Sequence, residues 1–438
     1  MRRIHAEGRW KIFMDFVRLR ILFLMSLLAL TALPVTSPLR GASSGPQEDL
    51  LTRAKRIHEK AVTLDAHVDI EVSFITPAFL LGHQQEKFVT LSKMDEGGLD
   101  AIVLAVFTGQ GALTQKDYLK AQALAFGNLE LIHNVFNRGV SDQIELASSP
   151  ADFERITGHG KKASLIGIEN AYPFGEDLDN FRKAARLGVV YVTLCHEGNN
   201  QFCDSNSNAV NPEVHSNGLS PLGEKAVTEM NRLGIIVDVS HLSKKSMLDA
   251  IRLSKAPVIA SHSGCRALCD VPRNLDDEQL LALKKNGGVV HIIGLNEYIK
   301  SESPPKRAAI KRLRTESGFP EEPGAFYLAF AKAENHQRHA YQSRLRDLDK
   351  KFHRVDIRDF VDHIDHVVNL IGVDHVGIAA DFFDSLSTID GWKDASESFH
   401  ITTELVKRGY AEVEIEKIWS GNFLRVWREV QKTIRPVN

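Results

Sequence analysis

Residues 234–263 read GIIVDVSHLSKKSMLDAIRLSKAPVIASHS, a pattern typical of one strand, one helix and a second strand in succession. Gly234–His241 and Ala256–Ser263 are short, continuously apolar runs rich in valine and isoleucine. Strands buried on both faces of a parallel sheet have this pattern. Ser243 is a candidate N-cap for the helical run between them. The stretch therefore predicts a βα repeat with a histidine at the carboxyl end of each strand.

Six further runs of the same kind extend the pattern in both directions: Val62–Asp69, Leu99–Phe107, Ala163–Asn170, Val189–His196, Gly287–Gly294 and His375–Phe382. Helical segments such as Pro221–Leu233 and Asp276–Asn286 lie between them, and the latter begins with acidic residues and ends before a glycine pair. Eight strands that alternate with helices predict a parallel sheet, and eight strands close a (β/α)8 TIM barrel. An open doubly wound sheet is the alternative, although no GxGxxG motif follows the first run.

The first 45 residues are expected to lie outside the fold. Arg18 and Arg20 precede an apolar run, Ile21–Val35, that is short for a membrane span, which favours a secretory signal peptide. An uncleaved N-terminal anchor is the alternative, and only that would attach the protein to a membrane. We expect an exported protein, periplasmic or extracellular.

Residues 46–438 are then predicted to form the barrel domain. An insertion at about 301–353, rich in Lys, Arg, Glu and Gln, separates the seventh and eighth strands, and we interpret Ala325–Lys351 as an exposed helix or helical pair. A net charge of −2 gives no argument for a nucleic-acid partner. The spacing of the four cysteines, Cys195, Cys203, Cys265 and Cys269, is unlike a zinc ribbon. We expect free thiols, with a disulfide as the alternative because an exported protein could pair them.

Metal-ligating side chains recur at the carboxyl ends of the runs, where barrel enzymes hold their active sites. His67 and Asp69 are two residues apart, so both side chains point to one face. Glu169, His241 and His262 end later runs, and these residue types suit zinc. Singly, each is more often structural; together they predict a metal site.

These five residues could hold one metal or share two. If Glu169 bridges, His67 and Asp69 complete one position, and His241 and His262 complete the other. A bridging water or hydroxide and the substrate carbonyl would take the open positions.

Other polar residues near these ends suggest further roles. Asp381 is a candidate for proton transfer, with metal ligation as the alternative. His196 is a candidate for polarising a carbonyl, and Arg273 for gripping a substrate carboxylate. We interpret His291 as core or as support for the site, and the helical stretch with His363 and His366 as a solvated face.

The chain resembles the membrane (renal) dipeptidase family of amidohydrolase-like barrels over nearly its whole length after residue 45. The resemblance is carried by LDAHVD, IGIEN, YVTLCH, VDVSHLS, VIASHS with VPRN, HVGIAAD and GNFLRVW. It implies a binuclear zinc dipeptidase that acts as a homodimer. It also implies that dipeptides with a C-terminal D-residue can be substrates. It also implies five zinc ligands with Glu169 bridging, substrate contacts at His196 and Arg273, and a proton shuttle at Asp381.

Two departures from the family pattern bear on this expectation. Val68 stands where the family usually has Asn, and Asp381 is followed by Phe382-Phe383-Asp384-Ser385-Leu386 in place of a glycine-rich sequence. The bulky loop is expected to reshape the pocket. The alternatives are therefore a metal-dependent amidase or lactonase with another substrate, and a catalytically weakened binding protein on the same barrel.

Overall fold

The structure is a computed structural model that describes residues 48–69, 88–139, 142–207, 209–321, 325–326, 329–330, 333–352, 354–382 and 388–435. The predicted signal segment, residues 1–45, lies outside the described residues. So does the loop expected to reshape the pocket from Phe383 to Leu386, although Phe382 is described.

Eight parallel strands form the predicted sheet, in the order β1-β2-β4-β5-β6-β7-β8-β9. Their bounds are Leu64–Val68, Ala101–Phe107, Lys162–Glu169, Val189–Thr193, Ile236–Asp238, Ile259–Ser263, Val289–Ile293 and Val376–Ala379. Seven lie inside one of the predicted runs, and β4 begins one residue before its run, Ala163–Asn170. A further short strand, β3 (Ile144–Leu146), pairs with the start of β4 and was not predicted.

The sheet curves until its two ends meet. The backbone N–H of Asp381, just after β9, donates to the carbonyl oxygen of His67 in β1 at 2.9 Å. The N–H of Ala380 donates to the buried carboxylate of Asp65 at 2.9 Å. The predicted barrel is therefore confirmed and the open sheet is excluded.

Alternate strand residues divide between the two faces of the barrel wall. In β2, Ile102 and Leu104 pack in one cluster with residues of helix α5 (Gln115–Gly139) outside the barrel. The first residues of several strands instead share a cluster with Phe423 and Trp427 of α18 (Asn422–Gln431). Helix α18 thus closes the amino-terminal end of the barrel, which leaves the carboxyl-terminal end of the strands as the place for a functional site.

Helices follow the strands as predicted. Helix α8 spans Pro221–Leu233, α9 spans Lys244–Leu253 behind the Ser243 cap, and α10 spans Asp277–Asn286 with a capping box at Asp276. Further helices are α2 (Leu50–Lys60), α4 (Leu91–Gly97), α5 (Gln115–Gly139), α6 (Pro150–Gly158), α7 (Asp179–Arg186), α15 (Ile357–Ile371) and α16 (Phe399–Lys407). Among the described residues, no helix combines the length and apolarity needed to cross a bilayer.

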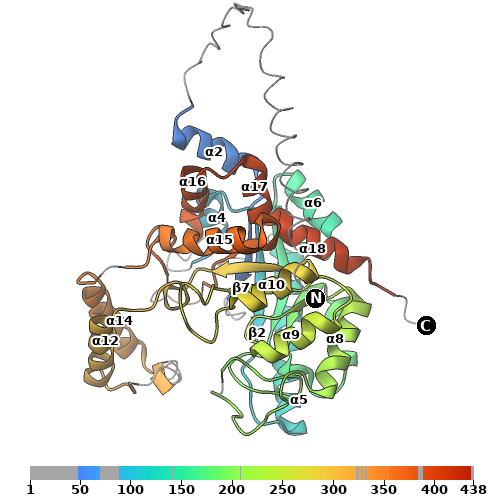
Figure 1. The fold of residues 1–438 in the computed structure, drawn as a ribbon. Coiled ribbons are helices and arrows are strands. Elements are labelled where there is room, and N and C mark those ends of the chain that lie inside the picture. The colour runs from blue at the N-terminus through green and yellow to red at the C-terminus, as the bar shows by residue number, and fades with distance from the viewer. Residues whose placement is uncertain are drawn as a thin grey trace, which may run out of the picture. The chain divides into compact units, whose positions relative to one another are not determined.

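The insertion between β8 and β9 is helical, but its helices have other bounds than predicted. Helix α12 spans Pro304–Glu316 and α14 spans Asn335–Asp349, and the two lie side by side (Figure 1). The prediction that the helical part begins at Ala325 was wrong because Ser303 caps α12, and proline is well tolerated in the first turn.

The predicted solvated face on α15 was wrong for His363. This side chain is buried; its Nδ1 accepts from the N–H of Cys265 at 2.9 Å, and its Nε2–H donates to the carbonyl of Ile299 at 2.8 Å. Helix α15 turns this residue toward the loop after β7. The four cysteines are buried free thiols, as expected.

Candidate metal centre

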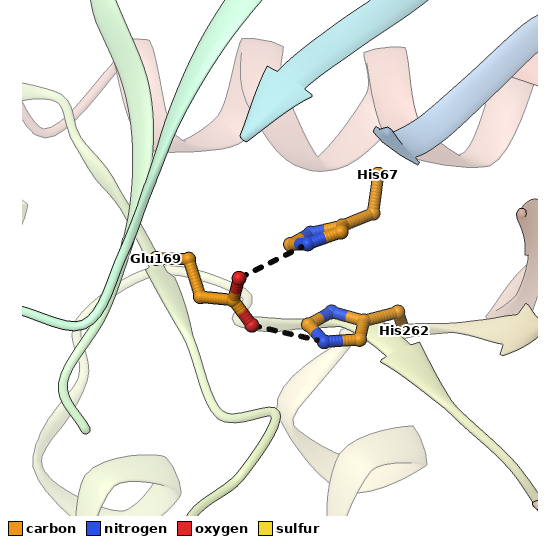
Figure 2. Close-up of side chains that lie close together, drawn as sticks. All are labelled: His67, Glu169 and His262. Atoms are coloured by element: carbon orange, nitrogen blue, oxygen red, sulfur yellow. Dashed lines mark ion pairs between the residues drawn. The ribbon is translucent and has the colours of Figure 1, made fainter. Parts of the chain in front are cut away.

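The five predicted ligands come together at the carboxyl ends of the strands. Glu169, at the end of β4, lies at their centre and is 2% exposed. Its Oε1 is 3.0 Å from Nε2 of His241 and 3.3 Å from Nε2 of His262, whereas its Oε2 is 3.5 Å from Nε2 of His67. Figure 2 shows the carboxylate between His67 and His262. One oxygen faces each half of the site.

The side chains on the His67 half are carboxylates. Asp69 Oδ1 lies 3.5 Å and Asp381 Oδ1 lies 3.8 Å from Nε2 of His67. On the other half, Nε2 of His196 lies 3.6 Å from Oε1 of Glu169, and its ring is 4.2 Å from that of His241. All predicted catalytic residues therefore border the same small space.

Three overlapping groups in the described chain have ligand atoms within 4.8 Å of one another: His67, Glu169 and His262; Glu169, His196 and His241; His67, Asp69 and Asp381. Five of these seven residues are the predicted ligands. The other two, His196 and Asp381, also lie within reach of a cation, so the ligation alternative for Asp381 stays open.

The backbone is left-handed at three positions in this region. Asn170, next to Glu169, has φ 75°, His241 has φ 66°, and Asp381 has φ 55°. Such values are unfavourable for residues other than glycine and concentrate at functional sites. The strain falls where the chain turns sharply out of β4, β6 and β9 to aim side chains into the site.

A buried network fixes the direction of two imidazoles. The Tyr191 hydroxyl donates to the carbonyl of Ala66 at 3.2 Å, so it accepts from Nδ1–H of His67 at 2.8 Å. The Ser261 hydroxyl donates to Asp238 at 2.6 Å, so it accepts from Nδ1–H of His262 at 2.8 Å. Both histidines therefore turn Nε2 toward the site and Nδ1 away from it, the orientation that metal ligands need.

Glycine makes room for this network. Gly167 in β4 is the register partner of Tyr191 in β5, and a Cβ at position 167 would come within 2.3 Å of the tyrosine ring. The glycine in the IGIEN motif is thus explained by a close approach between neighbouring strands.

The charges of the site suit a cation. Burial raises the pKa of Glu169. The nearby charges of His196 and His67, together with hydrogen bonds from His241 and His262, outweigh this effect and hold that pKa well below its usual value. Burial holds the pKa of both His241 and His262 well below the usual value, so they are neutral. Burial lowers the pKa of His67, but the charges of Glu169 and Asp69 prevail and raise it well above normal.

These residues fit a metal ion. Nε2 of His67 and Oδ1 of Asp69 are buried without a hydrogen-bond partner among the described residues. Two neutral imidazoles face each other across 3.0 Å between Nε2 atoms, beside an ionised carboxylate. Metal ions bound among these donors would satisfy them, and nitrogen with carboxylate oxygen is a zinc-type donor set.

Arg273 lies beside the centre as predicted. It is 6% exposed, and its Nη1 donates to the Ser263 hydroxyl at 2.8 Å. Its Nε and Nη2 have no partner within the described ranges. The Tyr298 ring lies 5.8 Å from its guanidinium carbon. A buried guanidinium with two N–H-bearing atoms unused is suited to a carboxylate ligand.

The sequence analysis did not identify three residues that orient the site histidines. Tyr191, Asp238 and Ser261 lie inside buried apolar runs, and Asp238 and Ser261 stand close to the predicted ligands His241 and His262 in VDVSH and VIASHS. That proximity was the available signal. His291 is core, as expected: its Nδ1–H donates to the carbonyl of Ala260 at 3.1 Å.

The two departures from the family pattern have different outcomes. Val68 packs in the hydrophobic core between His67 and Asp69, which face the site. Phe382 is buried against Phe88 and Trp392, so it is not a wall of the pocket. The effect of the remaining loop residues lies outside the described chain.

Comparisons with known proteins agree with this geometry. A family model for membrane dipeptidase (Peptidase family M19) matches residues 51–438. Dipeptidase tcpJ of Claviceps purpurea is 32% identical over 372 residues, which are 84% of this chain and 74% of the relative.

Solved structures share the fold. The probable dipeptidase PvdM from Pseudomonas aeruginosa is 34% identical with a TM-score of 0.74, covering 88% of this chain and 99% of that one. A metallopeptidase from Rhodobacter sphaeroides, liganded with a phosphinate mimic of the dipeptide L-Ala-D-Ala, is 20% identical with a TM-score of 0.64, covering 84% and 99%.

Proposed function

Because this chain belongs to the membrane dipeptidase family (Peptidase family M19), a family of metal-dependent hydrolases of dipeptides, we propose that it is a zinc dipeptidase with about two zinc ions per chain. His67, Asp69 and Glu169 would hold one ion, and Glu169, His241 and His262 the other. The observation that carries this proposal is that the two oxygens of Glu169 face different ligands: Oε1 faces His241 and Oε2 faces His67.

Bound zinc would supply an activated water or bridging hydroxide as the nucleophile and would stabilise negative charge on the carbonyl oxygen. The chain's own residues then orient the substrate. Arg273 would bind the carboxylate of the dipeptide through its two free nitrogens. His196 would donate a hydrogen bond to the carbonyl oxygen of the scissile bond.

Asp381 would take the proton of the attacking water and pass it to the leaving amine. Its position supports this role, because its Oδ1 is 3.8 Å from Nε2 of His67. Burial and the adjacent charge of Asp69 raise the pKa of Asp381 well above its usual value. A carboxyl group that binds a proton readily is suited to carry one between two steps.

We also propose that the protein is exported, after cleavage of a signal in residues 1–45, and acts as a homodimer. The basic residues before the apolar run at 21–35 support export. The family resemblance is the support for the dimer, and the molar mass in solution tests it.

The function is tested by incubating the zinc-loaded protein with a library of mixed L,L and L,D dipeptides and by metal analysis. We expect cleavage into amino acids and about two zinc ions per chain. The L,D members test whether a C-terminal D-residue is accepted. No zinc after reconstitution would contradict the metal site.

Blocked substrates separate the alternatives. Dipeptide amides and lactones lack the free carboxylate that Arg273 would bind, so they should react poorly. Efficient turnover of these compounds without turnover of dipeptides would favour an amidase or lactonase. Binding without turnover would favour a weakened binding protein.

A further inference from the structure

Phe107 is an exposed aromatic residue at the mouth of the site. It is the last residue of β2, and it is 42% exposed, although Val106 and Thr108 on either side are buried. Its ring centroid lies 4.7 Å from that of His196, and it is the register partner of Glu169. An exposed aromatic ring beside a reactive centre is a candidate for ligand contact.

The backbone around this ring is held in place. Asn170 donates to the carbonyl of Thr108 at 3.1 Å, and Gln110 donates to the carbonyl of Asn199 at 2.7 Å. The loop after β2 is thereby tied to the segments after β4 and β5. Phe107 presents its ring from a fixed position, so little conformational freedom is lost when a ligand packs against it.

The strand order places Phe107 across the mouth from Arg273. Phe107 ends β2, and Arg273 follows β7; these strands are four steps apart in either direction around the eight strands that close the barrel. An extended dipeptide spans roughly 7 Å. If its carboxylate binds Arg273 and its carbonyl lies at the centre, its amino-terminal residue would extend toward β2.

We propose that Phe107 is a specificity-determining residue that packs against the side chain of the amino-terminal residue of the dipeptide. The proposal rests on the dipeptidase function and adds a substrate class: dipeptides with an aromatic or branched aliphatic first residue. Apolar surface on both partners is removed from water only with such substrates.

The test compares kcat and KM of zinc-loaded wild-type protein, Phe107→Ala and Phe107→Leu on dipeptides with Gly, Ala, Leu or Phe first and one constant second residue. We expect Phe107→Ala to lower kcat/KM about tenfold for Leu- and Phe-dipeptides, chiefly through KM, and to change glycyl dipeptides little. Phe107→Leu should recover part of the loss. Leu124→Ala, which removes another exposed apolar side chain from α5, is the matched control.

Two results would overturn the proposal. An equal loss for all four dipeptides, with kcat affected, would show that Phe107 acts by positioning His196. An unchanged profile would show that the ring touches no substrate. Both differ from failure of the proposed function, in which wild-type protein cleaves none of the dipeptides. Unchanged zinc content and thermal unfolding of both variants exclude loss of the fold.

Discussion

Nε2 of His241 lies 3.0 Å from Nε2 of His262, and both atoms face Oε1 of Glu169. Burial keeps both imidazoles neutral by lowering their pKa values, so at most one proton can sit between them. Both neutral imidazoles would be ligands for a cation bound beside Glu169.

Zinc binding should release protons. Without metal, the charges of Glu169 and Asp69 outweigh the effect of burial and keep His67 protonated at neutral pH, and this proton must leave before Nε2 can ligate. Zinc affinity should therefore fall as the pH is lowered from 8 to 6. Titration calorimetry at pH 7 in buffers with different ionisation enthalpies should show about one or more protons released per chain.

The control is His366→Gln, which changes a histidine that pairs with Asp277 on the outside of α15. It should release the same number of protons. Identical binding enthalpies in all buffers would contradict the prediction.

Tyr191→Phe should weaken zinc binding about 10- to 100-fold, because Nδ1–H of His67 loses the hydroxyl that accepts it at 2.8 Å. The phenyl ring still fills the space beside Gly167. Competition with a chromogenic chelator measures the affinity. Tyr410→Phe removes a hydroxyl bonded to Asp365 and should leave it unchanged. Equal affinities for wild type and Tyr191→Phe would mean that the hydroxyl does not orient the ligand.

Arg273→Ala should raise KM for dipeptides. A charge-assisted hydrogen bond contributes about 1.5–3 kcal/mol, which corresponds to a factor of about 10 to 150. Arg266→Ala, on the same loop but exposed and paired with Asp270, is the control and should behave as wild type. Steady-state kinetics with an unchanged KM for Arg273→Ala would remove this residue from the carboxylate site.

Asp65 should make stability depend on pH. Burial raises the pKa of this carboxyl from 3.8 to about 7. Between these values the folded state binds more protons than the unfolded state, so the contribution to stability is fully present below pH 3.8 and is lost as the pH rises through about 7. The upper bound for this loss is about 4 kcal/mol.

Asp65→Asn keeps an oxygen to accept from the N–H groups of His67 and Ala380 and removes the titration. Relative to wild type, it should therefore be more stable at pH 8 than at pH 5. Denaturant unfolding at the two pH values measures the difference. A stability difference that does not vary with pH would show that Asp65 does not titrate in this range.

Most of the strands and helices could be predicted from short-range sequence patterns. The eight apolar runs predicted the strands because parallel strands buried on both faces need continuous apolar side chains. The segments Pro221–Leu233 and Asp276–Asn286 followed from helical periodicity, and the ends of the second followed from its acidic start and the glycine after it, which involve neighbouring residues only. The same patterns failed at α12, where the cap at Ser303 was overlooked, and at His363, where a helix face was assigned without knowing what packs on it.

The sequence by itself determined which residues are chemically able to ligate a metal and that they stand at strand ends: His67, Asp69, Glu169, His241 and His262. Only the tertiary structure decided which oxygen of Glu169 faces which histidine, which hydroxyls hold the imidazoles, and that Phe107 lies across the mouth from Arg273. The physical reason is that these contacts join residues tens to hundreds of positions apart. They depend on barrel closure and strand register, which no local pattern encodes.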